Sequence, residues 1–254
     1  MSSTDTLLRL GLTAGELMLR GGAEVCRVED TVQRILCAVG AEEADVIATP
    51  TGIYLTLSLG GELASAVRRV AHTAYDLSLV CAINQFSRSI DINTSPQTAL
   101  TALESLARHR EVYSPRVAAG AAFLAGGSFT ALFGGIAVDS LVGGIGGLLV
   151  FLLIGKLGRL GVNRFAVDYC GGALGALNAV LMYLILPTSL QPTVIGSILI
   201  LVPGVLLTNA VRDSISGDLL SGAARMVEAL FVAIAVAAGV GTVLSVWAAF
   251  GGLL

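Results

Sequence analysis

The chain has 254 residues, of which 55% are hydrophobic and only 13% are charged, and its mean hydropathy is +0.84. Because soluble domains carry about 25% charged residues, this composition predicts a membrane protein. The formal net charge is −3 and the sequence has no run of basic residues, so nucleic acid is not an expected partner.

Charge and glycine are unevenly distributed along the chain. Residues 1–116 contain ten Arg and thirteen acidic residues, whereas residues 117–254 contain five basic and five acidic residues. Glycine shifts the other way, with 23 of the 31 glycines after residue 116. The sequence therefore predicts two domains: a small α/β domain over residues 1–116 and a transmembrane domain over residues 117–254.

The first domain shows both helical and strand periodicity. Apolar residues at helical spacing predict helices over residues 5–20, 24–39, 75–91 and 96–111. Between Ile53 and Leu59, apolar and polar residues alternate after the turn residues Pro50-Thr51-Gly52. This pattern predicts a half-buried strand, and residues 46–49 are expected to pair with it.

The second domain contains long apolar segments. A transmembrane helix needs roughly 20 predominantly apolar residues, and five segments approach this length: about 117–137, 140–157, 166–186, 193–211 and 226–250. The first two are separated only by the region of Asp139, so one long irregular helix is the alternative to a hairpin there. The expected fold is thus a small α/β domain followed by a five-helix transmembrane bundle with one broken helix.

Positive charge alternates between the connections. Basic residues precede the first span, separate the second from the third, and separate the fourth from the fifth: Arg108, Arg110 and Arg116; Lys156, Arg159 and Arg164; Arg212 and Arg225. The connections near Asp139 and over residues 187–192 contain no Lys or Arg. Because cytoplasmic loops carry the excess of basic residues, the N-terminal domain is expected in the cytoplasm and the C-terminus outside a multi-pass inner membrane protein.

Pro203 interrupts the fourth span near its middle. Proline lacks an N–H and leaves the carbonyl of Leu199 without its helical donor, so the helix is expected to break. Irregular backbone at membrane depth is tolerated only where protein buries it or where it lines a wet cavity. Transporters use such breaks, because the N-terminus of the second half-helix attracts anionic substrate groups. The alternative is a packing kink satisfied by a neighbouring helix.

The residues at and beyond the break are the candidate substrate path. They are Pro203, Gly204, Asn209, Arg212, Asp213, Asp218, Arg225 and Glu228. Charged groups this close to a membrane are costly unless they are paired or hydrated, and Arg212 offers a bidentate partner for a carboxylate. A solvated loop is the alternative interpretation. Asp168 and Asn178 are secondary candidates within the third span.

The sequence contains no recognisable catalytic set. Its two histidines lie far apart, and the GxSxG, HExxH and Walker A patterns are missing. A hydrolytic site built from threonines and carboxylates is the remaining enzymatic alternative, drawn from Thr49, Thr51, Glu24, Glu29 and Asp30. We therefore expect no enzyme, no catalytic residue, no metal and no cofactor, and ATP is not an expected direct driver.

Three stretches together resemble a known transporter family. They are GGAEVCRVEDT (21–31), TPTGIYLTL (49–57) and PGVLLTNAVRDSISGDLLSGAARMVEA (203–229). In order and spacing they resemble the motifs of threonine/serine exporters. The resemblance implies secondary export of small hydrophilic metabolites, including threonine, serine and succinate-like dicarboxylates. Its first two motifs contribute the candidate residues of the cytoplasmic domain: Glu24, Arg27, Glu29, Thr49 and Thr51.

The resemblance also implies partners beyond the lipid and the substrate. In length the chain is similar to the long subunit of a split form, which works with a shorter all-membrane subunit; a homo-oligomer is the alternative. Five spans is an odd number, so a following five-span half would run in the opposite orientation, as in inverted-repeat transporters. Two other functions stay open: a membrane-anchored cytoplasmic sensor or scaffold, and a membrane-bound hydrolase.

Overall fold

The computed structural model describes residues 3–71, 75–108 and 113–250. The chain forms two compact units. One, here called the α/β unit, comprises residues 1–112 and 206–226; the other, the helical unit, comprises residues 113–205 and 227–254. By compactness, residues 206–226 therefore group with the N-terminal part of the chain, whereas the sequence assigned them to the transmembrane domain.

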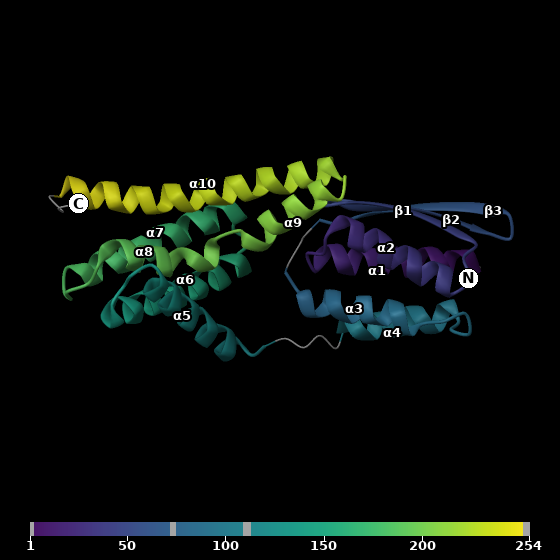
Figure 1. Ribbon diagram of the computed structural model, residues 1–254, viewed down its shortest axis with the longest axis horizontal. Helices are drawn as coiled ribbons and strands as arrows, with labels where there is room; N and C mark the ends of the chain where they lie inside the picture. The colour runs from purple at the N-terminus through teal and green to yellow at the C-terminus, as the bar shows by residue number, and fades with distance from the viewer. Residues whose placement is uncertain (1–2, 72–74, 109–112, 251–254) are drawn as a thin grey trace. The chain divides into compact units, whose positions relative to one another are not determined.

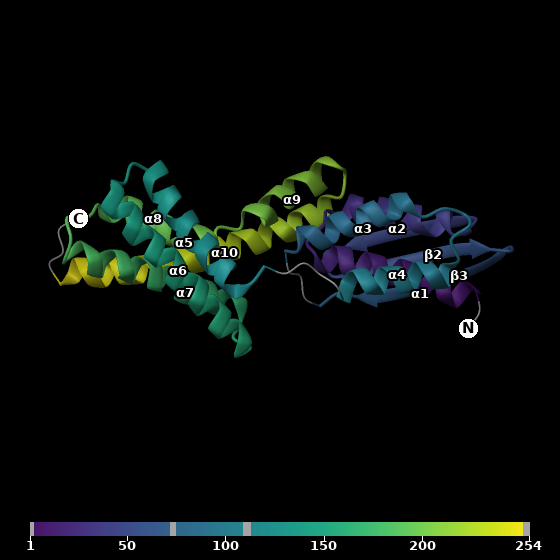
Figure 2. The same cartoon turned by 90° about the horizontal axis from the view of Figure 1, so that it is seen from below.

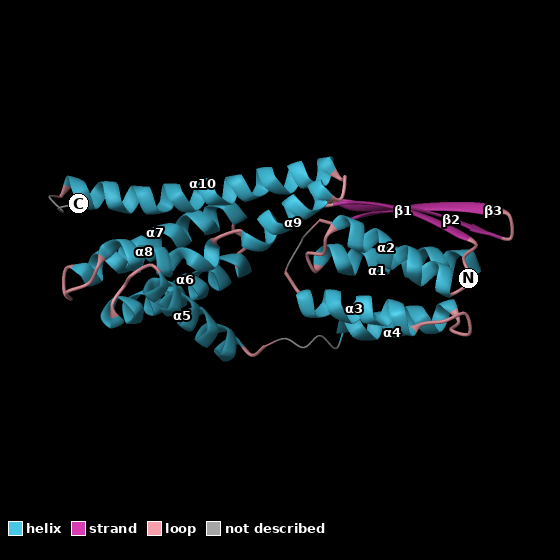
Figure 3. Cartoon of the chain, viewed as in Figure 1, coloured by secondary structure: helices cyan, strands magenta, loops and turns pink. Residues whose placement is uncertain are grey.

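The α/β unit contains helices on one side of a small sheet (Figure 1). Its N-terminal elements are α1 (Ser3–Arg20), α2 (Val25–Ala38), β1 (Glu43–Thr49), β2 (Gly52–Leu59), β3 (Glu62–Arg69), α3 (Leu77–Ser89) and α4 (Pro96–Arg108). The strands form one antiparallel sheet in the order β1-β2-β3, and these three are the only strands in the described part of the chain (Figure 3). The sequence did not predict β3, because its segment ELASAVRR lacks a clear apolar alternation.

The core of this unit lies between the sheet and α1–α2. One face of β2 buries Ile53, Leu55 and Leu57, each 1% exposed, while Tyr54 on the opposite face is 50% exposed. This division follows from the alternation of side chains along a strand. Helices α3 and α4 cover the other side of α1–α2 (Figures 1 and 2). The unit thus has three layers, and its sheet leaves one face uncovered by the unit itself.

Glycine permits the close contact between α1 and the sheet. A Cβ atom added at Gly15 would lie 1.8 Å from Cδ1 of Ile53. Any side chain there would displace a core residue of β2, so the packing of the helix on the strand depends on this glycine.

The helical unit is built from apolar helices joined by short turns. They are α5 (Pro115–Leu132), α6 (Ala137–Arg159), α7 (Arg164–Tyr183), α8 (Leu190–Ile198), the 3₁₀ turn η1 (Leu199–Leu201) and the greater part of α10 (Leu219–Ala249). Helices α5 and α6 are separate, with Gly134 at φ +90° in their connection. The region of Asp139 therefore follows a hairpin and is not part of one irregular helix.

Three described helices are long and apolar enough to cross a membrane. They are α6, α7 and α10, and the number rises to four if the bent pair Leu190–Leu201 and Gly204–Ile215 counts as one span. Helix α5 is not among them; its 18 residues include Pro115 and Arg116. The chain is thus a membrane protein by its helices, while the predicted count of five spans is not confirmed.

The helix carrying Pro203 is broken at the expected place. Helix α8 and η1 end before Val202, α9 (Gly204–Ile215) begins after Pro203, and the two segments are bent by 60°. The carbonyl of Leu199 is not left open, because the N–H of Val202 donates to it at 3.0 Å. A tight turn therefore replaces the helical bond that Pro203 removes.

Candidate functional site

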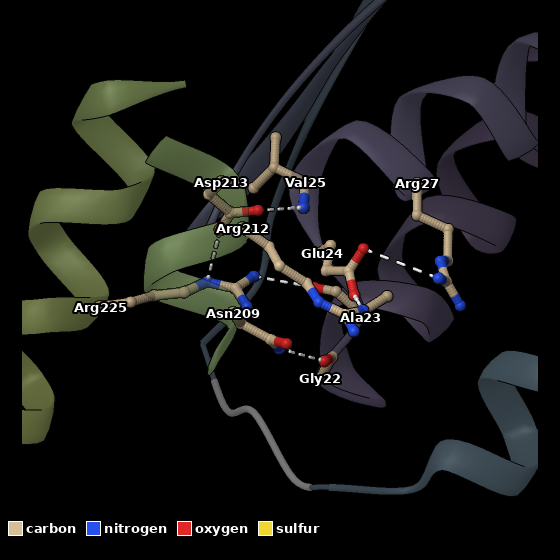
Figure 4. A network of polar contacts seen from close by, with 9 residues as sticks. All are labelled: Gly22, Ala23, Glu24, Val25, Arg27, Asn209, Arg212, Asp213 and Arg225. Carbon is tan, nitrogen blue, oxygen red and sulfur yellow. Dashed lines mark hydrogen bonds and ion pairs between the residues drawn. The ribbon is translucent and has the colours of Figure 1, made fainter. Parts of the chain in front are cut away.

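The polar residues that follow the break meet the turn between α1 and α2. This turn, residues Gly21–Glu24, contains Gly22 at φ +81°, a conformation that glycine adopts without a steric penalty. The stretch Leu206–Met226, which comprises most of α9 and the first turns of α10, belongs to the same compact unit as the turn. Figure 4 shows the side chains of this stretch directed at the turn.

Asp213 caps α2 from a distant part of the sequence. The first N–H groups of a helix have no partner within the helix, and the residue at the N-cap of α2, Glu24, makes no side-chain cap. Oδ1 of Asp213 accepts a hydrogen bond of 3.0 Å from the backbone N–H of Val25. A carboxylate at this position also interacts favourably with the positive end of the helix dipole.

Asp213 forms a buried ion pair with Arg225. Nε of Arg225 lies 3.1 Å from Oδ2 of Asp213, and the two side chains are 7% and 0% exposed. Arg225 also donates a 2.8 Å hydrogen bond to the carbonyl of Ala23, and Asn209 donates one of 2.8 Å to the carbonyl of Gly22. Asn209, Asp213 and Arg225 therefore bond to backbone groups of residues 22–25, and Asp213 and Arg225 also form an ion pair with each other.

Arg212 and Glu24 form the exposed part of this network. Nη1 of Arg212 donates to Oε1 of Glu24, and the Arg212 side chain is 55% exposed. Nη2 of Arg27 lies 3.7 Å from the other carboxylate oxygen of Glu24. We call Asn209, Arg212, Asp213 and Arg225, with their partners in residues 22–25 (Figure 4), the α9–α10 network.

Asp218 lies at the turn between α9 and α10. Its carboxylate accepts a 3.1 Å hydrogen bond from the N–H of Ser221, and its own N–H donates to the carbonyl of Asp213 at 2.9 Å. Gly217, at φ +95°, precedes it. These contacts show Asp218 closing the turn and capping α10.

The remaining motif residues connect α2 to the sheet and form a strand turn. Oε1 of Glu29 accepts a 2.8 Å hydrogen bond from the N–H of Ala48. Burial raises the pKa of Glu29; the bond from Ala48 opposes this shift, and nearby acidic groups, Asp218 first, add to it. The hydroxyl of Thr49 bonds to the carbonyl of Gly52 at 3.3 Å and lies 3.4 Å from that of Thr51. These contacts belong to the β1–β2 turn.

Glu228 and the two secondary candidates have partners in the helical unit. Arg164 donates a 2.7 Å hydrogen bond to Glu228 and lies 3.9 Å from Asp168. Asn178 donates a 3.1 Å hydrogen bond to the carbonyl of Val142. The predicted path residues are therefore divided between the two units. Across the described residues, no group of three or more His, Cys, Asp or Glu is arranged to hold a metal ion.

Sequence reasoning missed the main-chain partners of these side chains. The carbonyls of Gly22 and Ala23 and the N–H of Val25 engage Asn209, Arg225 and Asp213. The available signal was the pair Gly21-Gly22 just before α2. Backbone groups in such a turn have no partners within a helix, so they require partners from elsewhere in the chain.

Comparisons with known proteins agree with the motifs. The model of the family described as "Putative threonine/serine exporter" matches residues 9–247. A threonine/serine exporter of Corynebacterium glutamicum is 26% identical over 250 residues, which cover 94% of this chain and 51% of that protein. A "Probable threonine/serine exporter" of Mycobacterium tuberculosis (strain ATCC 25618 / H37Rv) is 26% identical over 244 residues, which cover 93% and 45%.

The chain spans about half the length of these curated relatives. No solved structure matches it. The family match nevertheless extends from the first helix of the α/β unit almost to the end of α10, so it includes both units and the network between residues 22–25 and 206–226. The chain belongs to the threonine/serine exporter family, a family of transporters and not of enzymes.

Proposed function

We propose that the chain is a subunit of a secondary transporter that exports small carboxylate-bearing metabolites from the cytoplasm. The observation that carries this proposal is the family match over residues 9–247, in a chain whose helices α6, α7 and α10 are long and apolar enough to span a membrane. The names of the relatives specify threonine and serine. Dicarboxylates such as succinate share the carboxylate and form the wider substrate class of the proposal.

The orientation follows from the connections between helices. Lys156 and Arg159 close α6, whereas the opposite connections, near Asp139 and over residues 187–192, contain no basic residue. By the positive-inside rule, the α/β unit, whose residues 206–226 include Arg212 and Arg225, lies in the cytoplasm and the C-terminal end of α10 outside the cell. This orientation requires α5 to cross the membrane as well, although α5 is not among the helices that qualify as spans by length and composition.

A second membrane component completes the transport path. The chain covers 51% and 45% of the two relatives, so it matches about half of each of these exporters. We propose a shorter all-membrane subunit, with a second copy of this chain as the alternative. Liposomes containing only this polypeptide are expected to show no efflux, and rapid efflux from them would contradict the need for a partner.

The chain passes from the helical unit into the α/β unit and back, and the α9–α10 network lies in the segment that does so. The chain enters the α/β unit at residue 206, just after the break at Pro203, and leaves it at residue 226. Within that unit, Asp213 and Arg225 fix the connecting segment to the α1–α2 turn. These contacts fix residues 206–226, which lie between the broken helix and the greater part of α10 in the sequence, within the α/β unit.

Arg212 is the proposed carboxylate-binding residue. Its side chain is 55% exposed and its partner in the structure is another carboxylate, that of Glu24. A substrate carboxylate that replaced Glu24 would accept the same charge-assisted hydrogen bond from Nη1 of Arg212, and a guanidinium can also hold a carboxylate with two parallel bonds. The buried residues Asp213 and Arg225 would keep α9 in place during this exchange.

The test measures export and membrane abundance for variants of Arg212. Cells that lack the chain and its partner are supplied with both genes and fed threonine- or serine-containing peptides, or succinate, and efflux is measured. We expect Arg212→Ala to abolish export at normal membrane abundance, and Arg212→Lys to retain part of it. Normal export by Arg212→Ala would remove this residue from the path, and no efflux of any of these substrates from wild-type cells would overturn the proposed function.

A further inference from the structure

Asp168 is a buried acidic residue on an apolar helix. It lies on α7 and is 8% exposed, and its Oδ2 atom has no hydrogen-bond partner among the described residues. Asp139, also buried in the helical unit, differs: its two carboxylate oxygens accept hydrogen bonds from the N–H groups of Ile136 and Ser189. Because buried polar atoms are almost always satisfied, the open oxygen of Asp168 requires an explanation.

A single cation is shared between Asp168 and Glu228. Nη1 of Arg164 lies 2.7 Å from Oε1 of Glu228 on α10, whereas its Nε lies 3.9 Å from Oδ2 of Asp168. The shorter contact is a charge-assisted hydrogen bond, and the longer one exceeds hydrogen-bond distance. Arg164 therefore neutralises mainly Glu228. We call Arg164, Asp168 and Glu228 the α7–α10 cluster.

The elements around α7 supply no second cation to Asp168. In the helical unit, the titratable side chains of α7 and of the helices packed on it are, besides this cluster, Asp139, Lys156 and Arg159 on α6 and Tyr169, Cys170 and Tyr183 on α7. Helix α8 and η1 contain none. Lys156 and Arg159 are exposed, and among the described residues Arg164 is the one ion-pair partner of Asp168.

Close packing couples α7 to α10 next to this cluster. A Cβ atom added at Gly172, one turn after Asp168, would lie 2.5 Å from the carbonyl oxygen of Val236. The hydroxyl of Tyr169 donates a 3.0 Å hydrogen bond to that of Thr242. The two helices are thus in backbone contact. The bond between Arg164 and Glu228 joins the first residue of α7 to the N-terminal part of α10.

We propose that Asp168 binds and releases a proton, and that this proton determines which carboxylate Arg164 pairs with. With a proton from water on Oδ2, the side chain is neutral and Arg164 stays with Glu228, as in the structure. When Oδ2 returns the proton to water, the new negative charge competes for Arg164 and weakens the link between α7 and α10. Acidic residues within membrane helices recurrently form proton pathways. The proton site itself does not depend on the proposed export function. Only the statement that the proton is the ion coupled to export rests on that function.

Infrared difference spectroscopy tests proton binding without requiring transport. The full-length chain in lipid nanodiscs is titrated with acid and base, and the C=O band of protonated carboxyl groups is followed. We expect Asp168→Asn to remove a titrating band, and Asp139→Asn, the matched buried aspartate, to retain it. Arg164→Gln should keep the band to a pH higher by about one unit or more, because it removes the opposite charge; Glu228→Gln should act in the opposite direction.

The outcomes separate this inference from the export function. An unchanged band in Asp168→Asn, or an unchanged pH range in Arg164→Gln, overturns the proton site even if wild-type cells export threonine. If the band behaves as expected but wild-type cells export nothing, the proton site stands and the export function fails. If Asp168→Asn does not fold, Asp168→Glu serves instead: its titrating band must move in frequency, and a band identical to wild type contradicts the assignment.

Discussion

The two charged clusters of this protein use similar residues in different ways. In the α9–α10 network, Oδ1 of Asp213 accepts a hydrogen bond from the N–H of Val25. Its Oδ2 has no hydrogen-bond partner among the described residues but lies 3.1 Å from Nε of Arg225, in an ion pair that is almost completely buried. In the α7–α10 cluster, Arg164 and Glu228 are 43% and 36% exposed and Asp168 has one unpartnered oxygen. The first cluster has one arrangement of partners, while the second has a cation placed between two acids.

This difference indicates different roles. A close, buried ion pair stabilises one conformation, because removal of either partner leaves a charge in a poorly solvated place. A cation shared between two carboxylates has a second arrangement available at small cost. We therefore assign a structural role to the first cluster and propose a switching role for the second, and the following variants test this assignment.

Asp213→Ala is expected to have the largest effect on stability. It removes the cap of Val25 and leaves Arg225 without its buried partner, and such losses cost about 3–5 kcal/mol. Hydrogen–deuterium exchange of the full-length protein should accelerate in residues 22–31 and 206–226. Asp213→Asn, which keeps an acceptor for Val25, should have an intermediate effect; wild-type protection in the alanine variant would show that the pair is dispensable.

The α/β unit is expected to lose stability as the pH rises through the titration of Glu29. Burial raises the pKa of Glu29 in the folded protein, so the folded state binds this proton more tightly than the unfolded state. The contribution of Glu29 is therefore most favourable below the pKa of an ordinary glutamate, about 4.3, and is lost as the pH passes the raised pKa. Exchange of the backbone amides of β2, which do not bond to Glu29, corrected for intrinsic rates, measures this dependence. Glu29→Gln should flatten it, and an unchanged pH profile would contradict the assignment to Glu29.

Glu228→Ala is expected to be mild, in contrast to Asp213→Ala. Its bond with Arg164 is partly exposed, and exposed ion pairs contribute about 0–1 kcal/mol. In addition, Arg164 has Asp168 as an alternative partner. Exchange rates in α7 and α10 measure the cost. A loss as large as that of Asp213→Ala would show that the α7–α10 cluster is structural and would remove the contrast between the clusters.

Arg27→Ala is expected to have the smallest effect. The pair between Arg27 and Glu24 is 3.7 Å long, lies on the surface of α2 and joins residues three apart. Pairs of this kind stabilise a helix by about 0.2–0.5 kcal/mol. Exchange at the start of α2 should stay close to wild type, and a large loss of protection there would mean that Arg27 supports the orientation of Glu24 toward Arg212.

The sequence by itself determined the class of protein and the positions of its interruptions. Composition indicated membrane helices, the alternation between Ile53 and Leu59 indicated a strand, and Pro203 indicated the break, because each depends on local chemistry. The number of spans could not be determined from the sequence in the same way. Helix α5, with Pro115 and Arg116 in its first turn, is not among the described helices that are long and apolar enough to cross a membrane.

Only the tertiary structure decided the partners of the charged residues. Arg225 and Glu228 lie three residues apart, which suggested one path, yet Arg225 pairs with Asp213 and Glu228 with Arg164. Strand β3 likewise is defined by its pairing with β2 and not by its own pattern. The physical reason is that helical periodicity places side chains on a face, whereas the backbone groups and charges that meet this face come from segments distant in the chain, as Val25 does for Asp213.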